Sequence, residues 1–134
     1  MGVKVDFSQF EALKVRLQKL EKTEQEQFLL KMTNKLTARA QAKTKKRTPV
    51  RTGDLRRNWH QQKARKVGRI FVGKIYNPMD YASYVNYGHR TRNNEGWVEG
   101  QHMMDKSLKE VENDMAKIIQ PELEKLLNGV LNGK

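Results

Sequence analysis

Three histidines and three aspartates are the residues that could bind a metal or carry acid–base chemistry: His60, His89, His102, Asp54, Asp80 and Asp105. The histidines share no short ligand spacing, and the chain has neither an HExxH nor a CxxC pattern. Acid–base catalysis needs two groups held together, and nothing in the sequence ties two of these aspartates to each other. Each aspartate also has a local role available, in a turn, at an N-cap and in a first helical turn respectively. We therefore expect no catalytic residue, no metal and no cofactor.

Patterns for nucleophilic and phosphate chemistry are absent as well. Ser8, Ser83 and Ser107 lie in no nucleophile-elbow pattern, and there is no GxxxxGK[ST] or GxGxxG run. The chain has no cysteine, which excludes disulfides and thiolate zinc sites. An enzyme such as a nuclease is therefore the weakest of the functional hypotheses, and we expect a protein that is not an enzyme.

The net charge of +12 is concentrated in one window, residues 39–74. It holds a single acid, Asp54, and these thirteen basic residues: Arg39, Lys43, Lys45, Lys46, Arg47, Arg51, Arg56, Arg57, Lys63, Arg65, Lys66, Arg69 and Lys74. A confined basic block indicates an acidic partner, which could be a protein surface or DNA. Three aromatic residues are interleaved with it, Trp59, Phe71 and Tyr76. They could stack on bases or form the inward side of a hairpin.

The length and composition indicate one domain over residues 1–134 with a small core. Only 37% of the residues are hydrophobic and 31% are charged, so a partner or self-association would help to bury the apolar faces. The segment 1–6 has no apolar h-region, and no window has 18 consecutive apolar residues. We expect synthesis inside the cell and no contact with a membrane.

Apolar periodicity predicts two helices in the first 47 residues. The first, within 1–22, has the stripe Phe7, Phe10, Leu13, Leu17 and Leu20, capped at Asp6 or by a capping box of Ser8 and Glu11. The second, within 23–47, runs from about Glu24 to Arg47, with a capping box of Thr23 and Glu26 and a stop before Pro49. Its stripe is Phe28, Leu29, Met32, Leu36 and Ala40. The stripe fades in 38–47, so we expect that half to leave the core.

Residues 48–79 are predicted to form a turn and a β-hairpin. The turn is at 51–54, and a short piece through Leu55 and Trp59 follows it. The hairpin arms are 58–66 and 69–76, joined by a turn at 66–69 that contains Gly68. In the second arm Phe71, Gly73 and Ile75 share one face, and Ile70, Val72 and Lys74 share the other.

Residues 80–99 combine an aromatic segment with a polar loop. Tyr81, Tyr84 and Tyr87 recur every three residues in a short helix stopped by Gly88. These tyrosines could form an interface or a local core under the hairpin, since tyrosine serves both uses. Residues 89–96 have the composition of a mobile loop, which could order on contact with a partner.

A final helix is predicted in 100–131. Its apolar face is Met103, Met104, Leu108, Val111, Met115, Ile118 and Ile119, continued by Leu123, Leu126, Leu127, Val130 and Leu131. Pro121 is expected to kink or restart it. The helix is acidic in patches, at Asp105, Glu110, Glu112, Asp114, Glu122 and Glu124. Such patches could complement the basic block of a neighbouring copy and steer assembly.

Three stretches in order, 48–59, 81–88 and 96–104, resemble a known family. They are similar to the tail-completion, or head–tail joining, proteins of long-tailed (siphovirus) bacteriophages, a group that includes the lambda minor tail protein Z. The resemblance covers residues 36–111, over half of the chain. The residues that carry it most clearly, expected to be mainly structural, are Thr48, Pro49, Thr52, Gly53, Leu55, Trp59, Tyr81, Tyr84, Tyr87 and Gly88.

The resemblance implies an α+β fold, with a small antiparallel, hairpin-based sheet packed against a long N-terminal helix and a long C-terminal helix. It also implies a virion structural protein of the neck, made in the host cytoplasm, that completes the tail and joins it to the DNA-filled head. The implied partners are neighbouring copies in a ring of six-fold symmetry, a head-side connector or stopper protein, and a tail terminator or tail tube protein. DNA in the channel is a further possible contact.

The residues that we expect to face a protein partner or DNA are basic: Lys43, Lys45, Lys46, Arg47, Arg51, Arg56, Arg57, Arg90 and Arg92. The alternative to the phage neck is a nucleic-acid-binding module that uses the segment 39–74, with an affinity that falls steeply with salt.

Overall fold

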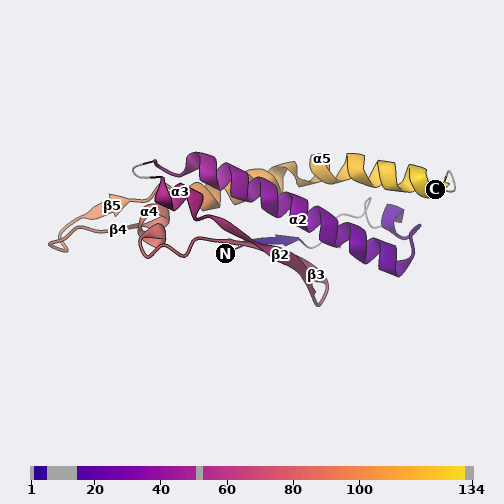
Figure 1. Cartoon of the computed structure of the whole chain (residues 1–134), viewed down its shortest axis with the longest axis horizontal. Coiled ribbons are helices and arrows are strands. Elements are labelled where there is room, and N and C mark those ends of the chain that lie inside the picture. The colour runs from indigo at the N-terminus through magenta and orange to yellow at the C-terminus, as the bar shows by residue number, and fades with distance from the viewer. Residues whose placement is uncertain (1, 6–14, 51–52, 132–134) are drawn as a thin grey trace.

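The computed structural model describes residues 2–5, 15–50 and 53–131, with side-chain burial from residue 15 to 129. Within this part the protein is α+β, as predicted, and is elongated along two long helices that lie side by side (Figure 1). In chain order the elements are β1 (Gly2–Val5), α2 (Lys22–Arg47), α3 (Asp54–Arg57), β2 (His60–Val67), β3 (Ile70–Tyr76), α4 (Ala82–Tyr87), β4 (Gly88–Arg90), β5 (Trp97–Glu99) and α5 (Met103–Leu131). No helix in the described part is long and apolar enough to cross a membrane.

The N-terminal region differs from the prediction of a helix over 1–22. Residues Gly2–Val5 form a strand, so the helical assignment is wrong there. Val5 pairs with Phe71, about half the chain away, and no local pattern announces such a distant partner. A helical turn is present at residues 15–17, and Leu17 and Leu20 are buried. The predicted caps and the rest of the apolar stripe lie in 6–14, outside the described residues.

The long helix α2 ends at Arg47, as Pro49 predicts, but it begins at Lys22 without the expected capping box. Its N-cap is Glu21, which makes no side-chain cap bond, and Thr23 lies inside the first turn. Gln25 Nε2 instead donates to the carbonyl of Leu20, 2.8 Å away. This bond ties the first turn of α2 to the residue before its N-cap, but it satisfies none of the free N–H groups at the helix start.

The prediction that residues 38–47 leave the core is wrong. The expected apolar stripe of α2 is buried, and it continues through Ala40 and Thr44, which are fully buried. Thr33, Thr37 and Thr44 donate their hydroxyls to carbonyls four residues earlier, at 2.7–2.8 Å. Because these hydroxyls are satisfied within the helix, small threonines can line a buried face. The stripe changes from large apolar to small side chains instead of ending.

The predicted hairpin is confirmed as β2 and β3, and its turn contains Gly68 with φ +63°. The strand β3 lies in the middle of a three-stranded antiparallel sheet of order β1-β3-β2. Phe71, Gly73 and Ile75 are buried on the face that meets α2, as their alternation predicts. A Cβ at Gly73 would overlap the side chain of Thr37, so glycine allows the sheet and the helix to approach closely.

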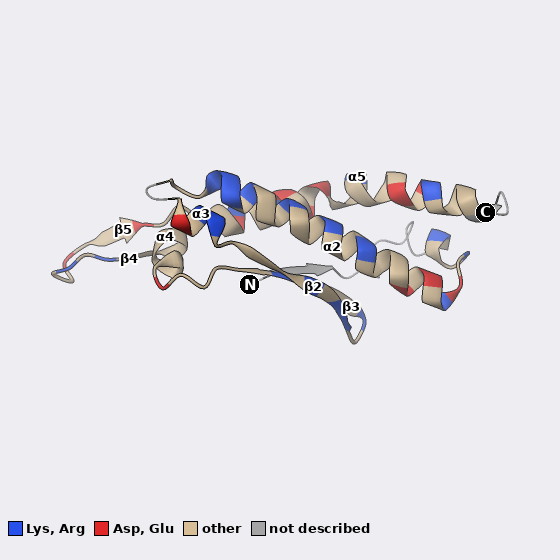
Figure 2. Cartoon of the chain, in the orientation of Figure 1, with Lys and Arg blue, Asp and Glu red and all other residues tan. Residues whose placement is uncertain are grey.

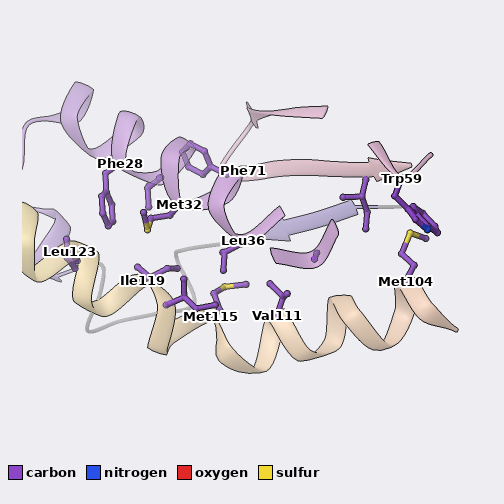
Figure 3. Close-up of a cluster of buried hydrophobic side chains, with 14 of the residues drawn as sticks. Phe28, Met32, Leu36, Trp59, Phe71, Met104, Val111, Met115, Ile119 and Leu123 are labelled. Carbon is purple, nitrogen blue, oxygen red and sulfur yellow. The ribbon is translucent and has the colours of Figure 1, made fainter. Parts of the chain in front are cut away.

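The helix α5 runs unbroken from Met103 to Leu131 with Pro121 inside it, so the alternative of a restart is wrong. Its predicted apolar face is buried or partly buried at every predicted position up to Leu127. Figure 3 shows Met32 and Leu36 of α2 meeting Met115 and Val111 of α5 across this core. At one end of the core Trp59 and Met104 pack together (Figure 3).

The predicted short helix is confirmed as α4, and it stops at Gly88, where φ is +94°. The predicted loop over 89–96 is shorter in the structure, because His89 and Arg90 belong to a strand, and its mobility stays a prediction. Strands β4 and β5 pair antiparallel, with His89 opposite Val98 and Arg90 opposite Trp97. The polar residues between them close the turn, where Thr91 N donates to the carbonyl of Gly96 at 3.0 Å. We call this second hairpin, residues 88–99, the arm. It projects from the same end as α3 and α4 (Figure 1).

Candidate interaction surface

The basic residues at the end of α2 are committed largely to contacts within the chain. Lys43 Nζ lies 2.9 Å from Glu110 Oε2 on α5. Arg47 donates to Ser107 Oγ at 3.0 Å and also pairs with Glu110. Two of the cations that we expected to face a partner therefore join α2 to α5. Lys45 is half-buried and Lys46 is exposed at the same helix end (Figure 2).

The acidic patches of α5 are committed in the same way. Besides Glu110, Glu122 pairs with Lys35 of α2 at 2.7 Å, and Glu124 pairs with Arg16. The hydrogen bond from Lys35 lowers the pKa of Glu122 below its ordinary 4.5. Glu110 and Glu122 thus join α5 to α2, and Glu124 joins α5 to the turn before α2. A contact of these acids with a neighbouring copy stays a prediction.

The first motif, 48–59, wraps the end of α2 with buried side chains. Trp59 Nε1 donates to Thr48 Oγ1 at 2.8 Å, and Thr48 in turn donates to the carbonyl of Thr44 at 2.6 Å. Leu55 is the buried residue of α3, and Gly53, just before that helix, has the left-handed φ of +82°. Pro49 is exposed, whereas Arg51 and Thr52 lie outside the described residues. The buried members of this motif form the joint between α2 and the sheet.

The two arginines of α3 differ in their surroundings. Arg56 Nη2 donates to the carbonyl of Thr48 at 3.0 Å, which ties α3 to the end of α2. Arg57 is exposed and pairs with Asp54, three residues before it, at 2.5 Å. Arg90 and Arg92 are exposed on the arm. Of the predicted contact residues within the described part, Lys46 on α2, Arg57 on α3, and Arg90 and Arg92 on the arm are exposed.

Exposed aromatic and apolar residues gather at the end of the molecule that carries the arm. Tyr81, Tyr84 and Tyr87 are 40%, 58% and 41% exposed, so they do not form the local core that was one of their two predicted uses. The ring of Tyr84 lies against His89 of the arm, with centroids 5.8 Å apart. Trp97 and Val98 of the arm are 57% and 44% exposed. Large exposed apolar groups beside cations are typical of protein interfaces.

The arm is held at its base by backbone contacts to α4. Gln101 N donates to the carbonyl of Val85 at 2.8 Å, and His102 N donates to that of Asn86 at 2.9 Å. Asn86 Oδ1 accepts from Met104 N at 3.1 Å and so caps the start of α5. A Cβ at Gly100 would overlap the backbone of α4, which explains a glycine there. The end of α4 and the start of α5 thus form one joint.

Two ionisable side chains at this joint have shifted pKa values. His102 lies 3.1 Å from Glu99 and 3.2 Å from Asp105, and these hydrogen bonds raise its pKa above 6.5. The pKa of Tyr87 is raised above 10.0 by burial and by the charge of Asp105. The side chain of Asn86 next to it acts in the opposite direction and lowers the pKa of Tyr87. Both shifts favour the proton-bearing form near neutral pH.

An open hollow of about 180 Å³ lies between the end of β3, α4 and the start of α5. Most of its lining is buried: Ile75 fully, and Trp59, Met104, Ala82 and Asn86 almost wholly. The exposed part of the lining includes Tyr76, Ser83 and Tyr87.

The residues considered for catalysis are not brought together. In the described ranges no group of three histidines, cysteines, aspartates or glutamates could hold a metal ion. His60 stacks near Tyr76 on the sheet, His89 is on the arm, and His102 begins α5. Asp80 is exposed before α4, and the N-cap of that helix is Tyr81, without a side-chain cap bond.

The sequence analysis did not select Asn86, Trp97 or Val98 as contact residues. For the last two a signal was present, because an apolar pair between Gly96 and Gly100 in a polar segment is typical of a short strand. The sequence around Asn86 gives no such signal, because the burial of Asn86 depends on α5 packing against α4. The surface that emerges consists of α3, α4 and the arm, which together we call the arm end.

The fold is an elongated α+β domain around one core, and several exposed aromatic residues and cations lie at one of its ends. A family model described as "Bacteriophage HK97-gp10, putative tail-component" matches residues 11–88, more than half of the chain. The chain therefore belongs to the HK97-gp10-like family of bacteriophage tail components. No curated protein and no solved structure matches it. This match confirms the prediction of a phage tail component. The narrower similarity to the lambda minor tail protein Z stays a prediction.

Proposed function

We propose that this protein completes the phage tail at its head-proximal end and joins the tail to the DNA-filled head. One observation carries the proposal: in a chain of a phage tail-component family, exposed aromatic residues and exposed cations meet at the arm end. Two cations at the end of α2, Lys43 and Arg47, pair with Glu110 and join α2 to α5. The two long helices are thus joined to each other, and the proposed contact surface lies at one end of them.

Assembly of several copies in a ring fits this role. A closed ring needs two different surfaces on each subunit that complement each other. A ring of six would match the symmetry of a long tail, and its two rims would meet a head-side connector or stopper protein and a tail terminator or tail tube protein. Surface complementarity performs this function, and no covalent chemistry is required. In the virion the protein would lie in the neck.

The proposal is tested by joining heads to tails in vitro. Heads and tails made in the absence of this protein are purified separately and mixed with and without it, and plaque-forming particles are counted. We expect infectious particles only when the protein is present. If heads and tails join equally well without it, or still fail to join when it is added, the joining role is wrong.

Binding to nucleic acid is the second candidate, and the open face of the sheet supports it. On the face away from α2, Arg65 and Lys74 are exposed, and the rings of His60 and Tyr76 lie 5.5 Å apart. Cations beside aromatic rings suit a nucleic-acid strand. Neutralising about six phosphates would give a log–log salt slope near −5. A chain that binds no DNA at about 50 mM salt would exclude this candidate.

A further inference from the structure

The β2–β3 hairpin carries cations and no acid. Residues 55–79 contain seven Lys or Arg and no Asp or Glu, and five of the seven lie within the hairpin: Lys63, Arg65, Lys66, Arg69 and Lys74. All five are exposed. Among the described residues one carboxylate is bonded to the hairpin, that of Glu26, whose Oε1 lies 2.6 Å from Lys66 Nζ. Four cations of the hairpin therefore have no ion pair within the described part of the chain.

The long helices and the arm differ from the hairpin, because their cations have acids nearby. In α2, Lys35 pairs with Glu122, and both Lys43 and Arg47 pair with Glu110, since α5 packs alongside. The helix α5 itself has four lysines and six acids, and the arm has two arginines and two glutamates. Figure 2 shows Lys and Arg without Asp or Glu along β2 and β3, and both kinds along α5. The hairpin is thus where the basic charge of the chain is least compensated.

Protection of a sheet edge explains only part of this charge. Cations on an edge strand prevent pairing with other chains, and β2 is an edge of the sheet. That edge already has a bulge between Gln62 and Arg65, where Ala64 N donates to Asn34 Oδ1 of α2 at 2.7 Å. Lys74 has no such role, because β3 lies between β1 and β2. It is nevertheless exposed, on the same open face of the sheet as Arg65.

The rest of the open face contains nothing that would repel an anion. Lys74 lies opposite Gln62, and Arg65 lies opposite Val72, so the two cations occupy neighbouring rows on different strands. Such rows are two residues, or roughly 7 Å, apart along a strand. Arg69, in the turn, adds a cation at the far end of the hairpin. Regularly placed cations on a face without acids suit a partner with regularly placed negative charges, as in a nucleic-acid backbone.

We infer that the open face of the sheet contacts the phosphate backbone of double-stranded DNA through Arg65, Arg69 and Lys74, without reading its sequence. Binding of a single strand uses successive rings on which bases stack, whereas His60 and Tyr76 form one pair whose rings lie 5.5 Å from each other. The inference deepens the proposed function and rests on it, because it states which face of a joining protein is turned toward the DNA. The arm end then stays available for protein contacts.

The test compares two full-length double variants with the same change in charge. Arg65→Gln with Lys74→Gln, the face variant, removes two cations from the open face. Arg39→Gln with Lys117→Gln, the control variant, removes two exposed cations from the groove between α2 and α5. Binding to a fluorescent duplex of about 30 base pairs, roughly three helical turns, is measured by anisotropy from about 50 to 200 mM salt. We expect the face variant to bind about tenfold or more weakly than the control variant, with a log–log salt slope smaller by about 2.

Two single variants extend the test. Arg69→Gln lies in the turn and changes no strand residue, so it tests the face even if the double change disturbs the sheet. It should weaken duplex binding about threefold or more and lower the salt slope by about 1. Tyr76→Leu removes an exposed ring and should leave duplex binding unchanged. A single strand of the same length is measured beside the duplex, because stacking on Tyr76 would matter for the single strand.

Three results would overturn the inference without touching the proposed function. The first is equal binding of the duplex by the face and control variants, which would mean that net charge alone attracts the DNA. The second is tighter binding of the single strand, weakened about tenfold or more by Tyr76→Leu, which would identify a stacking site. The third is a face variant that binds the duplex like the parent but no longer joins heads to tails, which would identify an acidic protein as the partner of this face. If the face binds the duplex as expected but heads and tails join without the protein, the proposed function fails instead.

Discussion

The two hairpins of this protein are built alike but used differently. The first, β2 and β3, has a third strand beside it and buries Phe71 and Ile75 under α2. The arm, β4 and β5, pairs only with itself, and Trp97 and Val98 are exposed. The first hairpin packs on α2 through one face of β3, whereas the arm is held at its base. The comparison indicates that one hairpin stabilises the fold and the other is available for contacts.

The largest expected effect comes from truncating one apolar side chain in each hairpin. Ile75 is fully buried, so Ile75→Ala should lower the free energy of unfolding by about 2–5 kcal/mol. Val98→Ala in the exposed arm should change it by about 0.5 kcal/mol or less. Urea denaturation of both variants measures the difference. Equal losses would show that the arm is packed as tightly as the first hairpin.

Glycines sharpen the same comparison. A Cβ at Gly73 overlaps Thr37 of α2, whereas a Cβ at Gly96 in the arm meets Thr91 Cγ2 at 3.3 Å. Gly73→Ala should therefore cost about 1–3 kcal/mol through overpacking, and Gly96→Ala should cost less. Combining Gly73→Ala with Thr37→Ala should recover part of the loss, as thermal unfolding of the single and double variants would show. No recovery would mean that the close approach is not the cause.

The two tryptophans provide a smaller, matched contrast. Trp59 is buried and donates to Thr48 Oγ1, so Trp59→Phe should cost about 1–2 kcal/mol, mainly from the lost hydrogen bond. Trp97→Phe removes an exposed indole and should leave the stability of the fold unchanged. Denaturation curves for both variants test this contrast. A larger loss for Trp97→Phe would place that residue in the core.

The smallest effect concerns pH at the base of the arm. Because the pKa of His102 is raised above 6.5 in the folded chain, its bonds to Glu99 and Asp105 contribute fully below pH 6.5. The contribution is lost as the pH rises through the raised, folded pKa. An NMR titration of the His102 ring should therefore show a pKa above 6.5, with arm resonances shifting in the same transition. Glu99→Gln should move this pKa down, and a ring that titrates below 6.5 in the parent would contradict the arrangement.

The same contrast explains which parts of the site could be predicted. The periodicity of β3 placed Phe71, Gly73 and Ile75 on one face correctly, because a packed strand leaves a two-residue pattern. The arm has no buried face, so its strands left no such pattern and resembled a loop. The exposure of Tyr81, Tyr84 and Tyr87 could not be predicted either. Their spacing predicts a helix, but it does not say which element packs against that helix.

The basic window, residues 39–74, shows most clearly which features could be predicted from the sequence and which could not. The sequence by itself determined the end of α2 at Arg47, the first hairpin with its turn, the short α4 and the apolar face of α5, since each follows from local spacing or from proline and glycine. It also located the charge in residues 39–74.

Only the tertiary structure decided what those charges do. Lys43 and Arg47 meet Glu110 more than sixty residues away because α2 and α5 pack antiparallel, and no local pattern encodes that pairing. Contacts between α4 and the start of α5 bury Asn86 in the same way. Contacts between distant segments depend on how whole elements pack, which is why the contact surface emerged only from the fold.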